Sequence, residues 1–264
     1  MIELNGHIIK QNKFPDGTLL MKYEKGYFPN HNTITWKYEN DGEMFAVMCL
    51  ANHIREHNAG AYIELDMPYL PNARQDRVKS DEDVFTLKYF CNFINSLCFD
   101  KVIVTDVHSN VGLALLDRVV ERKPVMSLWN VLDTIPVENP LVCFYPDEGA
   151  MKRYSDTNTA PYAYGIKKRN WETGAIESLE LAGAIDKIAG ADVLIVDDIC
   201  SKGGTFYHSA KALKEAGAAN IYLYITHCEN TIHEGELLNS DLIKHIYTTD
   251  SILTKDHKKI TVIE

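Results

Sequence analysis

A pair of acids followed by a glycine-rich turn has the residue types and spacing to bind a phosphorylated ligand. Asp197 and Asp198 come directly after the apolar run 193–196, and the Gly-Gly-Thr turn at 203–205 precedes a predicted helix. Backbone N–H groups in such a turn, together with the helix dipole, favour a phosphate. Two carboxylates would repel phosphate alone, so the ligand should also carry sugar hydroxyls or a divalent cation. The alternative is an ordinary strand–turn–helix corner with solvated acids. The order of strand, acid pair, glycine turn and helix favours a binding site over this alternative.

A second polar group also follows a predicted strand. Arg74, Gln75, Asp76 and Arg77 end an irregular loop that comes after the predicted strand 61–67. The planar guanidinium of arginine makes paired bonds to phosphate, and Gln75 can donate to or accept from a purine. A solvated charge cluster is the commoner case for such a run, but the position just past a strand end favours ligand binding.

Several histidines and one more acid are candidate ligands. His108 follows the predicted strand 101–105, where a hydrogen-bonded strand-end histidine is the local alternative. Asp147 offers the oxygen ligand that Mg²⁺ prefers, although acids in turns after proline are common. His53 and His57 lie four residues apart on a predicted helix and could bind a metal. The sequence shows no third ligand for them, which favours an ordinary helix surface.

A basic segment interrupts an otherwise acidic chain. Lys167, Lys168 and Arg169 fall within residues 163–174, a polar stretch with glycine at positions 165 and 174 that we expect to be the most mobile part of the chain. Such a segment could close over a polyphosphate and neutralise the negative charge that grows during its transfer. The alternative is a solvated basic surface loop.

Strands and helices are predicted to alternate along the chain, which is typical of α/β proteins with parallel sheets and crossover helices. The predicted strands are 61–67, 101–105, 193–196 and 221–226, and the predicted helices are 83–97, 111–120, 176–188 and 205–216, the last with Gly217 as its C-terminal cap. The two halves share this outline. We therefore expect two domains of similar fold, joined near residues 121–130.

The composition excludes several classes of protein. A net charge of −10 over 264 residues argues against a general nucleic-acid binder. There is no apolar run long enough to span a membrane, and residues 1–5 lack the basic and apolar regions of a signal peptide. The six cysteines show no C-x-x-C metal spacing and are typical of reduced core residues in a cytoplasmic protein.

These motifs together resemble the ribose-phosphate diphosphokinase family, the phosphoribosyl-diphosphate (PRPP) synthetases. The acid pair and its turn are similar to the PRPP-binding loop that this family shares with type I phosphoribosyltransferases, whereas the Arg74–Gln75 loop is similar to the ATP loop of the synthetases alone. The similar segments, in chain order, are 14–18, 66–77, 105–110, 146–153, 166–169, 197–205, 225–228 and 247–251. A single such match would be weak evidence, but so many in the same order are specific.

The resemblance implies a reaction, a fold and a role for each candidate residue. It implies transfer of the β,γ-diphosphoryl group of ATP to ribose 5-phosphate, giving PRPP and AMP, by two phosphoribosyltransferase-like domains at 1–124 and 125–264. It implies that the first domain carries the ATP loops and that Mg²⁺ is the cofactor.

The resemblance also implies a role for each candidate residue. The implied ATP-binding residues are Asp16, Gly17, Thr18, Arg74, Gln75, Asp76 and His108. The implied ribose 5-phosphate residues are Asp197, Asp198, Ser201, Lys202, Gly203, Gly204 and Thr205. Catalysis is implied for Lys167, Arg169 and His108, and metal binding for His108 and Asp147. The resemblance also implies a homo-oligomer, a dimer or hexamer, in which the Asp16 loop serves a neighbouring subunit.

The chain departs from the family pattern in three places. Ser201 and Lys202 replace an acid and a threonine of the PRPP loop, so phosphate would be held there by a hydroxyl and an added positive charge. Thr18 replaces a glutamate of the ATP loop, which weakens the case for a nucleotide contact at that position. The chain is also shorter than most relatives at both ends, so the hexamer and its allosteric phosphate or ADP site do not follow from the resemblance.

Two alternative functions stay open at this point. A phosphoribosyltransferase that consumes PRPP would need the acid pair and turn but not the Arg74–Gln75 loop or His108. A catalytically silent regulatory relative would fit the changes at Thr18, Ser201 and Lys202. Retention of Lys167, Arg169 and His108 favours an active synthetase over both.

Overall fold

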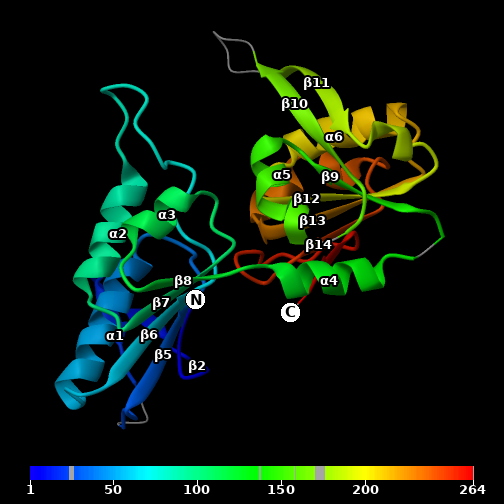
Figure 1. The fold of residues 1–264 in the computed structure, drawn as a ribbon. Helices are drawn as coiled ribbons and strands as arrows, with labels where there is room; N and C mark the ends of the chain where they lie inside the picture. Colours follow the sequence, from blue (N-terminus) through cyan, green and yellow to red (C-terminus); the bar gives the residue numbers. More distant parts are fainter. Residues whose placement is uncertain (24–26, 137, 158, 170–175, 264) are drawn as a thin grey trace. The chain divides into compact units, whose positions relative to one another are not determined.

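The chain folds into two compact units, Met1–Lys123 and Pro124–Glu264, in a computed structural model (Figure 1). The structure describes residues 1–23, 27–136, 138–157, 159–169 and 176–263, and for 167–169 and 176–179 it describes the backbone alone. Both units are sheets flanked by helices, and most of their strands run parallel. The predicted α/β fold class is therefore confirmed, and each unit is described below by itself.

Unit 1 is built on a six-stranded sheet in the order β2-β1-β5-β6-β7-β8. The parallel strands are β5 (His31–Trp36), β6 (Tyr62–Met67), β7 (Lys101–Thr105) and β8 (Val119–Arg122). The short strands β1 (Ile2–Leu4) and β2 (His7–Ile8) add an antiparallel edge, and β3 (Gln11–Lys13) pairs with β4 (Leu19–Met21) in a separate hairpin. Ligands of open parallel sheets bind beyond the carboxyl ends of the strands, which places residues after β6 and β7 at such an edge.

The helices of unit 1 are α1 (Glu43–His57), α2 (Thr86–Ser96) and α3 (Asn110–Leu115). Along α1 the buried apolar residues recur at helical spacing, and they pack in one cluster with β5 and β6. These residues are Ala46, Val47, Leu50, Ala51 and Ile54. The opposite side of α1 is left to solvent, and it carries Asn52, Glu56 and His57.

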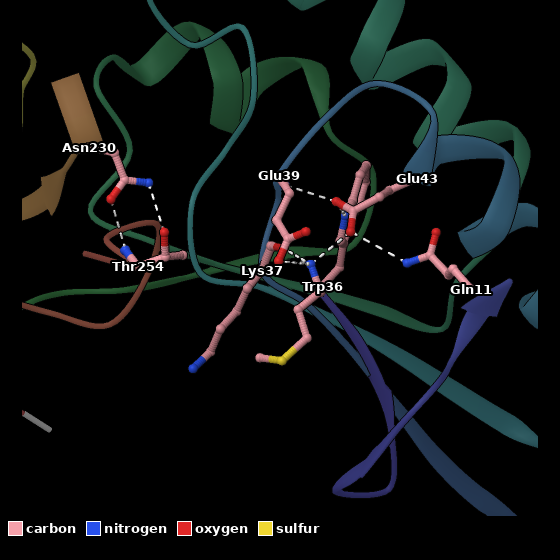
Figure 2. A network of polar contacts seen from close by, with 8 residues as sticks. Gln11, Trp36, Lys37, Glu39, Glu43, Asn230 and Thr254 are labelled. Carbon is pink, nitrogen blue, oxygen red and sulfur yellow. Dashed lines mark hydrogen bonds and ion pairs between the residues drawn. The ribbon is translucent and has the colours of Figure 1, made fainter. Parts of the chain in front are cut away.

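Glu43, at the start of α1, is a buried acid with a complete set of partners (Figure 2). Its carboxylate lies 2.7 Å from the ammonium of Met1 and accepts hydrogen bonds from the Trp36 indole at 2.9 Å and the Glu39 N–H at 2.8 Å. Burial alone would raise the pKa of Glu43, but these donors outweigh it, so its pKa lies below the ordinary value. Glu43 therefore stabilises the junction of α1 with the sheet as an anion.

Unit 2 is built on a seven-stranded sheet in the order β11-β10-β9-β12-β13-β14-β15. Its strands are β9 (Leu141–Tyr145), β10 (Tyr162–Arg169), β11 (Ile176–Gly183), β12 (Asp192–Cys200), β13 (Asn220–Cys228), β14 (His245–Thr248) and β15 (Ile260–Val262). All neighbours are parallel except β10 and β11, which form an antiparallel hairpin that extends from one edge (Figure 1).

Both faces of this sheet are covered, which explains why β12 is apolar at every position from 193 to 196. Val193 and Ile195 pack in one hydrophobic cluster, whereas Leu194 and Val196 pack in another on the opposite face. The helices are α4 (Val125–Thr134), α5 (Glu148–Tyr154) and α6 (Gly204–Glu215), with 3-10 turns η1 (Ser155–Thr157), η2 (Ile185–Lys187), η3 (Asn230–Glu234) and η4 (Leu237–Asn239). A continuous apolar run is typical of a strand buried on both sides.

The end of α6 confirms the predicted glycine cap. Gly217 has φ +92°, its N–H donates to the Lys214 carbonyl, and the Ala218 N–H donates to the Leu213 carbonyl, both at 3.0 Å. This pair of bonds is the Schellman motif, which satisfies carbonyls that a helix end leaves open. Among the described residues, no helix is long and apolar enough to cross a membrane.

Two predicted helices were wrong. Residues 176–183 form β11 and only 185–187 make a helical turn, because backbone pairing with β10, which includes Lys167 with Leu179, takes up this segment. The second predicted helix, 111–120, ends at Leu115, and Val119 and Val120 pair with β7 instead. In both cases apolar spacing fitted a helix and a strand alike, and sheet pairing decided the outcome. The expectation of mobility for 163–174 falls partly on β10 and partly outside the described residues.

Candidate active site

The turn before α6 has the geometry of an anion site. Gly203 has φ +81°, and a Cβ at this position would lie 2.8 Å from a methyl carbon of Leu237, so only glycine fits. At Gly204, by contrast, no described heavy atom lies within 4 Å of where a Cβ would be. No side chain of the described residues caps the N-terminus of α6. Its first N–H groups are thus available to a negatively charged ligand.

The two acids of β12 have different surroundings. Asp198 is 3% exposed and forms an ion pair with Arg153 of α5 at 3.1 Å. Asp197 is half-buried and accepts a hydrogen bond from the Asp198 N–H at 3.0 Å. Burial within the unit, then the charge of Asp198 and the charge of Asp147, raise the pKa of Asp197 well above its ordinary value. Arg153 thus offsets the charge of Asp198, whereas no cation among the described residues forms an ion pair with Asp197.

Asp147 lies at the end of β9 and at the start of α5. Its carboxylate accepts a hydrogen bond from the Ala150 N–H at 3.0 Å, which caps the helix and fixes the side chain. Since its charge acts on Asp197, the ends of β9 and β12 form one acidic cluster. Oxygen donors that repel one another are the donor set that a hard divalent cation such as Mg²⁺ prefers, so these residues fit such an ion.

The two residues that depart from the family loop are held by the neighbouring turn η3. The Ser201 hydroxyl lies 3.1 Å from the Thr231 hydroxyl, which donates to Glu229 at 3.0 Å. Lys202 pairs at 3.1 Å with Glu234, and both side chains are largely exposed. The charge of Lys202 is therefore shared with a carboxylate on the surface. The η3 turn is fixed in its own right by Asn230 and Thr254, which exchange two hydrogen bonds (Figure 2).

Polar side chains at the ends of β13 and β14 form a buried network beside the acid cluster. Thr249 and Ser251 donate hydrogen bonds to the Thr226 carbonyl at 2.6 and 3.2 Å. The Ser251 hydroxyl also lies 2.9 Å from Nδ1 of the buried His227. These residues belong to the segments 225–228 and 247–251, and the network explains their types: they fix the loops after two strands of the site.

In unit 1, the loop after β6 places Arg74 and Asp76 differently. Asp76 is 5% exposed and is bound by Arg77, whose Nε lies 2.7 Å from the carboxylate. Gln75 accepts a hydrogen bond from the Thr86 hydroxyl at 2.7 Å, while Arg74 is exposed. Asp76 and Gln75 therefore shape the loop, and Arg74 is the side chain best placed to reach a ligand.

The loop after β7 adjoins the same region of unit 1. Asp106 is fully buried at φ +44°, a conformation that a residue other than glycine adopts only at a cost and that is common at functional sites. The hydrogen bond and charge of Arg77 lower the pKa of Asp76, and the charge of His108 adds to the effect. The structure thus brings the Arg74–Arg77 loop and His108 together at the carboxyl edge of β6 and β7.

The segment 14–18 is the exposed tip of the β3–β4 hairpin. Asp16 accepts hydrogen bonds from the Thr18 hydroxyl at 2.7 Å and the Thr18 N–H at 2.9 Å, and these bonds lower its pKa. Gly17 has φ +85°, as the tight turn requires. Thr18 therefore orients Asp16 in place of the family glutamate.

The predicted residues fall into three groups. Within unit 2 the structure brings Asp147, Asp197 and Asp198 together. The turn that includes Thr205 comes directly after β12. Within unit 1 it brings Asp76 and His108 together, and Asp16 to Thr18 form a separate hairpin tip. The side chains of Lys167 and Arg169 lie outside the described residues. The sequence-based assignment missed Arg153, the ion-pair partner of Asp198; an arginine one helical segment after Asp147 was the available signal.

Curated relatives match over most of the chain. It is 31% identical over 224 residues to the ribose-phosphate pyrophosphokinase of Pasteurella multocida, a match that covers 81% of this chain and 68% of that protein. It is 28% identical over 265 residues to the ribose-phosphate pyrophosphokinase of Sulfurisphaera tokodaii, covering 97% of this chain and 88% of that protein. No model of a protein family matches the sequence.

A solved structure shares the fold. The phosphoribosylpyrophosphate synthetase of Mycobacterium smegmatis superposes with a TM-score of 0.77, over 97% of this chain and 85% of that one. The two sequences are 16% identical, so this comparison concerns the architecture alone. It spans both units of the chain.

Proposed function

The chain belongs to the ribose-phosphate pyrophosphokinase family, and from this membership we propose how its residues divide the reaction. The activity is the transfer of the β,γ-diphosphoryl group of ATP to O1 of ribose 5-phosphate, which gives PRPP and AMP. A β-phosphorus is attacked and negative charge grows on phosphoryl oxygens, so positioning and charge stabilisation dominate catalysis. The protein must supply one site for each substrate.

We assign ribose 5-phosphate to the carboxyl end of β12. The turn Ser201–Thr205 and the N-terminus of α6 bind the 5-phosphate, because their N–H groups are uncapped and space is open above Gly204. Asp197 and Asp198 accept hydrogen bonds from the ribose hydroxyls. The observation that carries this assignment is the asymmetry of the acid pair: the protein satisfies Asp198 through Arg153 and leaves Asp197 for the sugar.

We assign ATP to the carboxyl edge of unit 1. Arg74 and Gln75 contact the nucleotide from the loop after β6, and His108 contacts its phosphates from the loop after β7. Asp76 holds that loop in place through Arg77. Asp16, Gly17 and Thr18 form an exposed hairpin tip, a position suited to ATP of a neighbouring subunit in a homo-oligomer.

Mg²⁺ is the cofactor that we expect, with Asp147 and His108 as candidate ligands. The mutual repulsion of the unit 2 acids supports a cation there. When bound, the ion neutralises polyphosphate charge.

Lys167 and Arg169, on β10, are proposed to stabilise the transition state. All six cysteines are free, which supports a reducing, cytoplasmic location.

The silent regulatory subunit and the PRPP-consuming transferase are not favoured. The relatives from Pasteurella multocida and Sulfurisphaera tokodaii, which align over more than two thirds of their own length, both carry the pyrophosphokinase name. A transferase would also have no use for a nucleotide edge in unit 1.

The role of Lys167 can be tested against its neighbour. Lys167→Ala should lower kcat about a thousandfold with a modest change in the KM values, because its contacts strengthen in the transition state. Lys168→Ala is the matched control, since it removes the same charge one position further on and should keep near-normal turnover. Equal loss in both variants would mean that β10 acts through overall charge, and near-normal turnover of Lys167→Ala would remove this residue from the mechanism.

A further inference from the structure

Three side chains of α1 that can bind a metal lie close together. The possible ligand atoms of His53, Glu56 and His57 all lie within 4.8 Å of one another. Positions i, i+3 and i+4 share one side of a helix, so the cluster follows from the helix itself. None of the three belongs to the residues assigned to the reaction. Glu56 supplies the third ligand that the sequence alone did not reveal.

The protonation of His57 suits a metal ligand. Its Nδ1 lies 2.9 Å from the carbonyl oxygen of His53. A carbonyl oxygen only accepts, so Nδ1 carries the hydrogen and Nε2 keeps its lone pair. Metal-bound histidines are commonly oriented by such a bond from the second ring nitrogen to a carbonyl.

An aromatic side chain holds both rings. Phe28 contacts the His53 ring edge-on at 5.3 Å between centroids and the His57 ring at 5.5 Å, while the two imidazoles lie 4.2 Å apart. Phe28 itself is 4% exposed. The imidazoles are thus oriented before any ion binds, which reduces the entropy cost of binding.

A cavity provides room for the remaining ligand. It has a volume of about 380 Å³ and is lined by His53 and Glu56 of α1 and by Met21 and Tyr23 at the end of the β3–β4 hairpin. A zinc site with three protein ligands keeps one position for water or an external molecule, and that position needs such space. The tetrahedral arrangement requires ligand atoms about 3.3 Å apart. The three ligand atoms, now within 4.8 Å of one another, must therefore move closer on binding, and the exposed side chains of Glu56 and His57 can turn to do so.

We propose that His53, Glu56 and His57 bind one borderline divalent transition-metal ion, represented by Zn²⁺. Two imidazoles and one carboxylate suit Zn²⁺, Co²⁺ or Ni²⁺, whereas Mg²⁺ prefers oxygen ligands alone. The magnesium needed for the reaction therefore does not compete for this site. The site uses none of the acids of unit 2.

Metal binding should stiffen the hairpin that carries Asp16. Fixing the two imidazoles fixes Phe28, which stacks on Tyr23 at 4.9 Å, and Tyr23 lies two residues after the end of β4. A ligand that binds only the folded state raises the melting temperature in proportion to the logarithm of its concentration. Zn²⁺ should thus raise the Tm of unit 1.

The test uses the full chain, stripped with a chelator and kept in excess Mg²⁺. Titration calorimetry with Zn²⁺ should show one ion per chain, and Co²⁺ should give the visible absorption of a four-coordinate site. His53→Ala and His57→Ala should each weaken Zn²⁺ binding at least tenfold and abolish the cobalt spectrum. His7→Ala, at an exposed histidine of β2 in the same unit, should leave both unchanged.

Alanine is well tolerated in a helix, so these variants should fold, and Glu56→Gln gives a second measurement that keeps size and removes charge. It should weaken Zn²⁺ binding while leaving the far-ultraviolet circular dichroism unchanged. The proposal fails if the His53→Ala/His57→Ala double variant binds Zn²⁺ as the wild type does, or if the wild type binds no Zn²⁺ in excess Mg²⁺.

Discussion

Glu43 in unit 1 and Asp197 in unit 2 are both acids with little exposure to solvent, but their pKa values are shifted in opposite directions. Burial acts to raise the pKa of both, yet that of Glu43 is lowered by the donors around it, whereas that of Asp197 stays raised beside Asp198. Four donors surround Glu43, whereas the arginine beside the acid pair, Arg153, binds Asp198 and not Asp197. Glu43 thus stabilises the fold, and acids with a raised pKa, such as Asp197, are candidates for a functional site.

The largest expected effect concerns the acid that awaits a ligand. Asp197→Asn should lower kcat/KM for ribose 5-phosphate about a hundredfold, close to 2.7 kcal/mol, because an amide accepts hydroxyl donors less well than a carboxylate. The KM for ATP should change little. Steady-state kinetics with each substrate varied in turn checks this, and a defect confined to ATP would mean that the two sites are exchanged.

Glu43→Gln should have the opposite effect: it should lower stability and leave activity nearly unchanged. The amide removes one of the two carboxylates that pair with the Met1 ammonium and weakens the bonds from Trp36 and Glu39, so the free energy of unfolding should fall by about 2 kcal/mol. Kinetic constants for both substrates should remain within twofold. Urea denaturation followed by tryptophan fluorescence measures the loss, and unchanged stability would remove the structural role of Glu43.

Asp197→Asn should, in contrast, stabilise the ligand-free protein. A raised pKa means that ionised Asp197 is unfavourable in the fold, so its removal should raise the Tm by a few degrees at neutral pH. Asp198→Asn is the comparison variant: it removes the carboxylate charge that pairs with Arg153 and should lower the Tm. If the two variants shift the Tm in the same direction, the assigned asymmetry of the pair is wrong.

The smallest expected effects concern how the stability differences between these variants and the wild type change with pH. A lowered pKa stabilises the fold above the unfolded value, near 4.5 for Glu43, and this contribution is lost as the pH falls through the folded value. A raised pKa costs stability once the pH rises above the unfolded value, near 3.8 for Asp197. Relative to wild type, Glu43→Gln should therefore melt lower and Asp197→Asn higher at neutral pH, and both differences should shrink on acidification. Calorimetric scans from acidic to neutral pH check that the Tm differences of the two variants have opposite signs.

Local patterns along the chain predicted four of the strands, β6, β7, β12 and β13, and the turn from β12 into α6. The run 193–196, the glycine at 203 and the cap at Gly217 have one physical solution each, so sequence sufficed for them. Helix 176–188 was wrong because its apolar spacing fits two periods and only pairing with β10 decides between them.

Contacts between distant residues were beyond such patterns. The Arg153–Asp198 ion pair and the Thr231–Ser201 contact each depend on the fold. Sequence could supply the residue types at these places, but not which of them meet. This is why the contact of Arg153 with Asp198 emerged only from the structure.

The most direct test of the account follows the β-phosphorus of ATP. Purified protein with Mg²⁺ and ribose 5-phosphate would receive ATP that carries a radioactive label on that atom, and the products would be separated by chromatography. We predict label in PRPP, an equal amount of AMP, and neither product when the sugar is omitted. Label in ADP or free phosphate, or no product that depends on ribose 5-phosphate, would contradict the assignment of a diphosphoryl transferase.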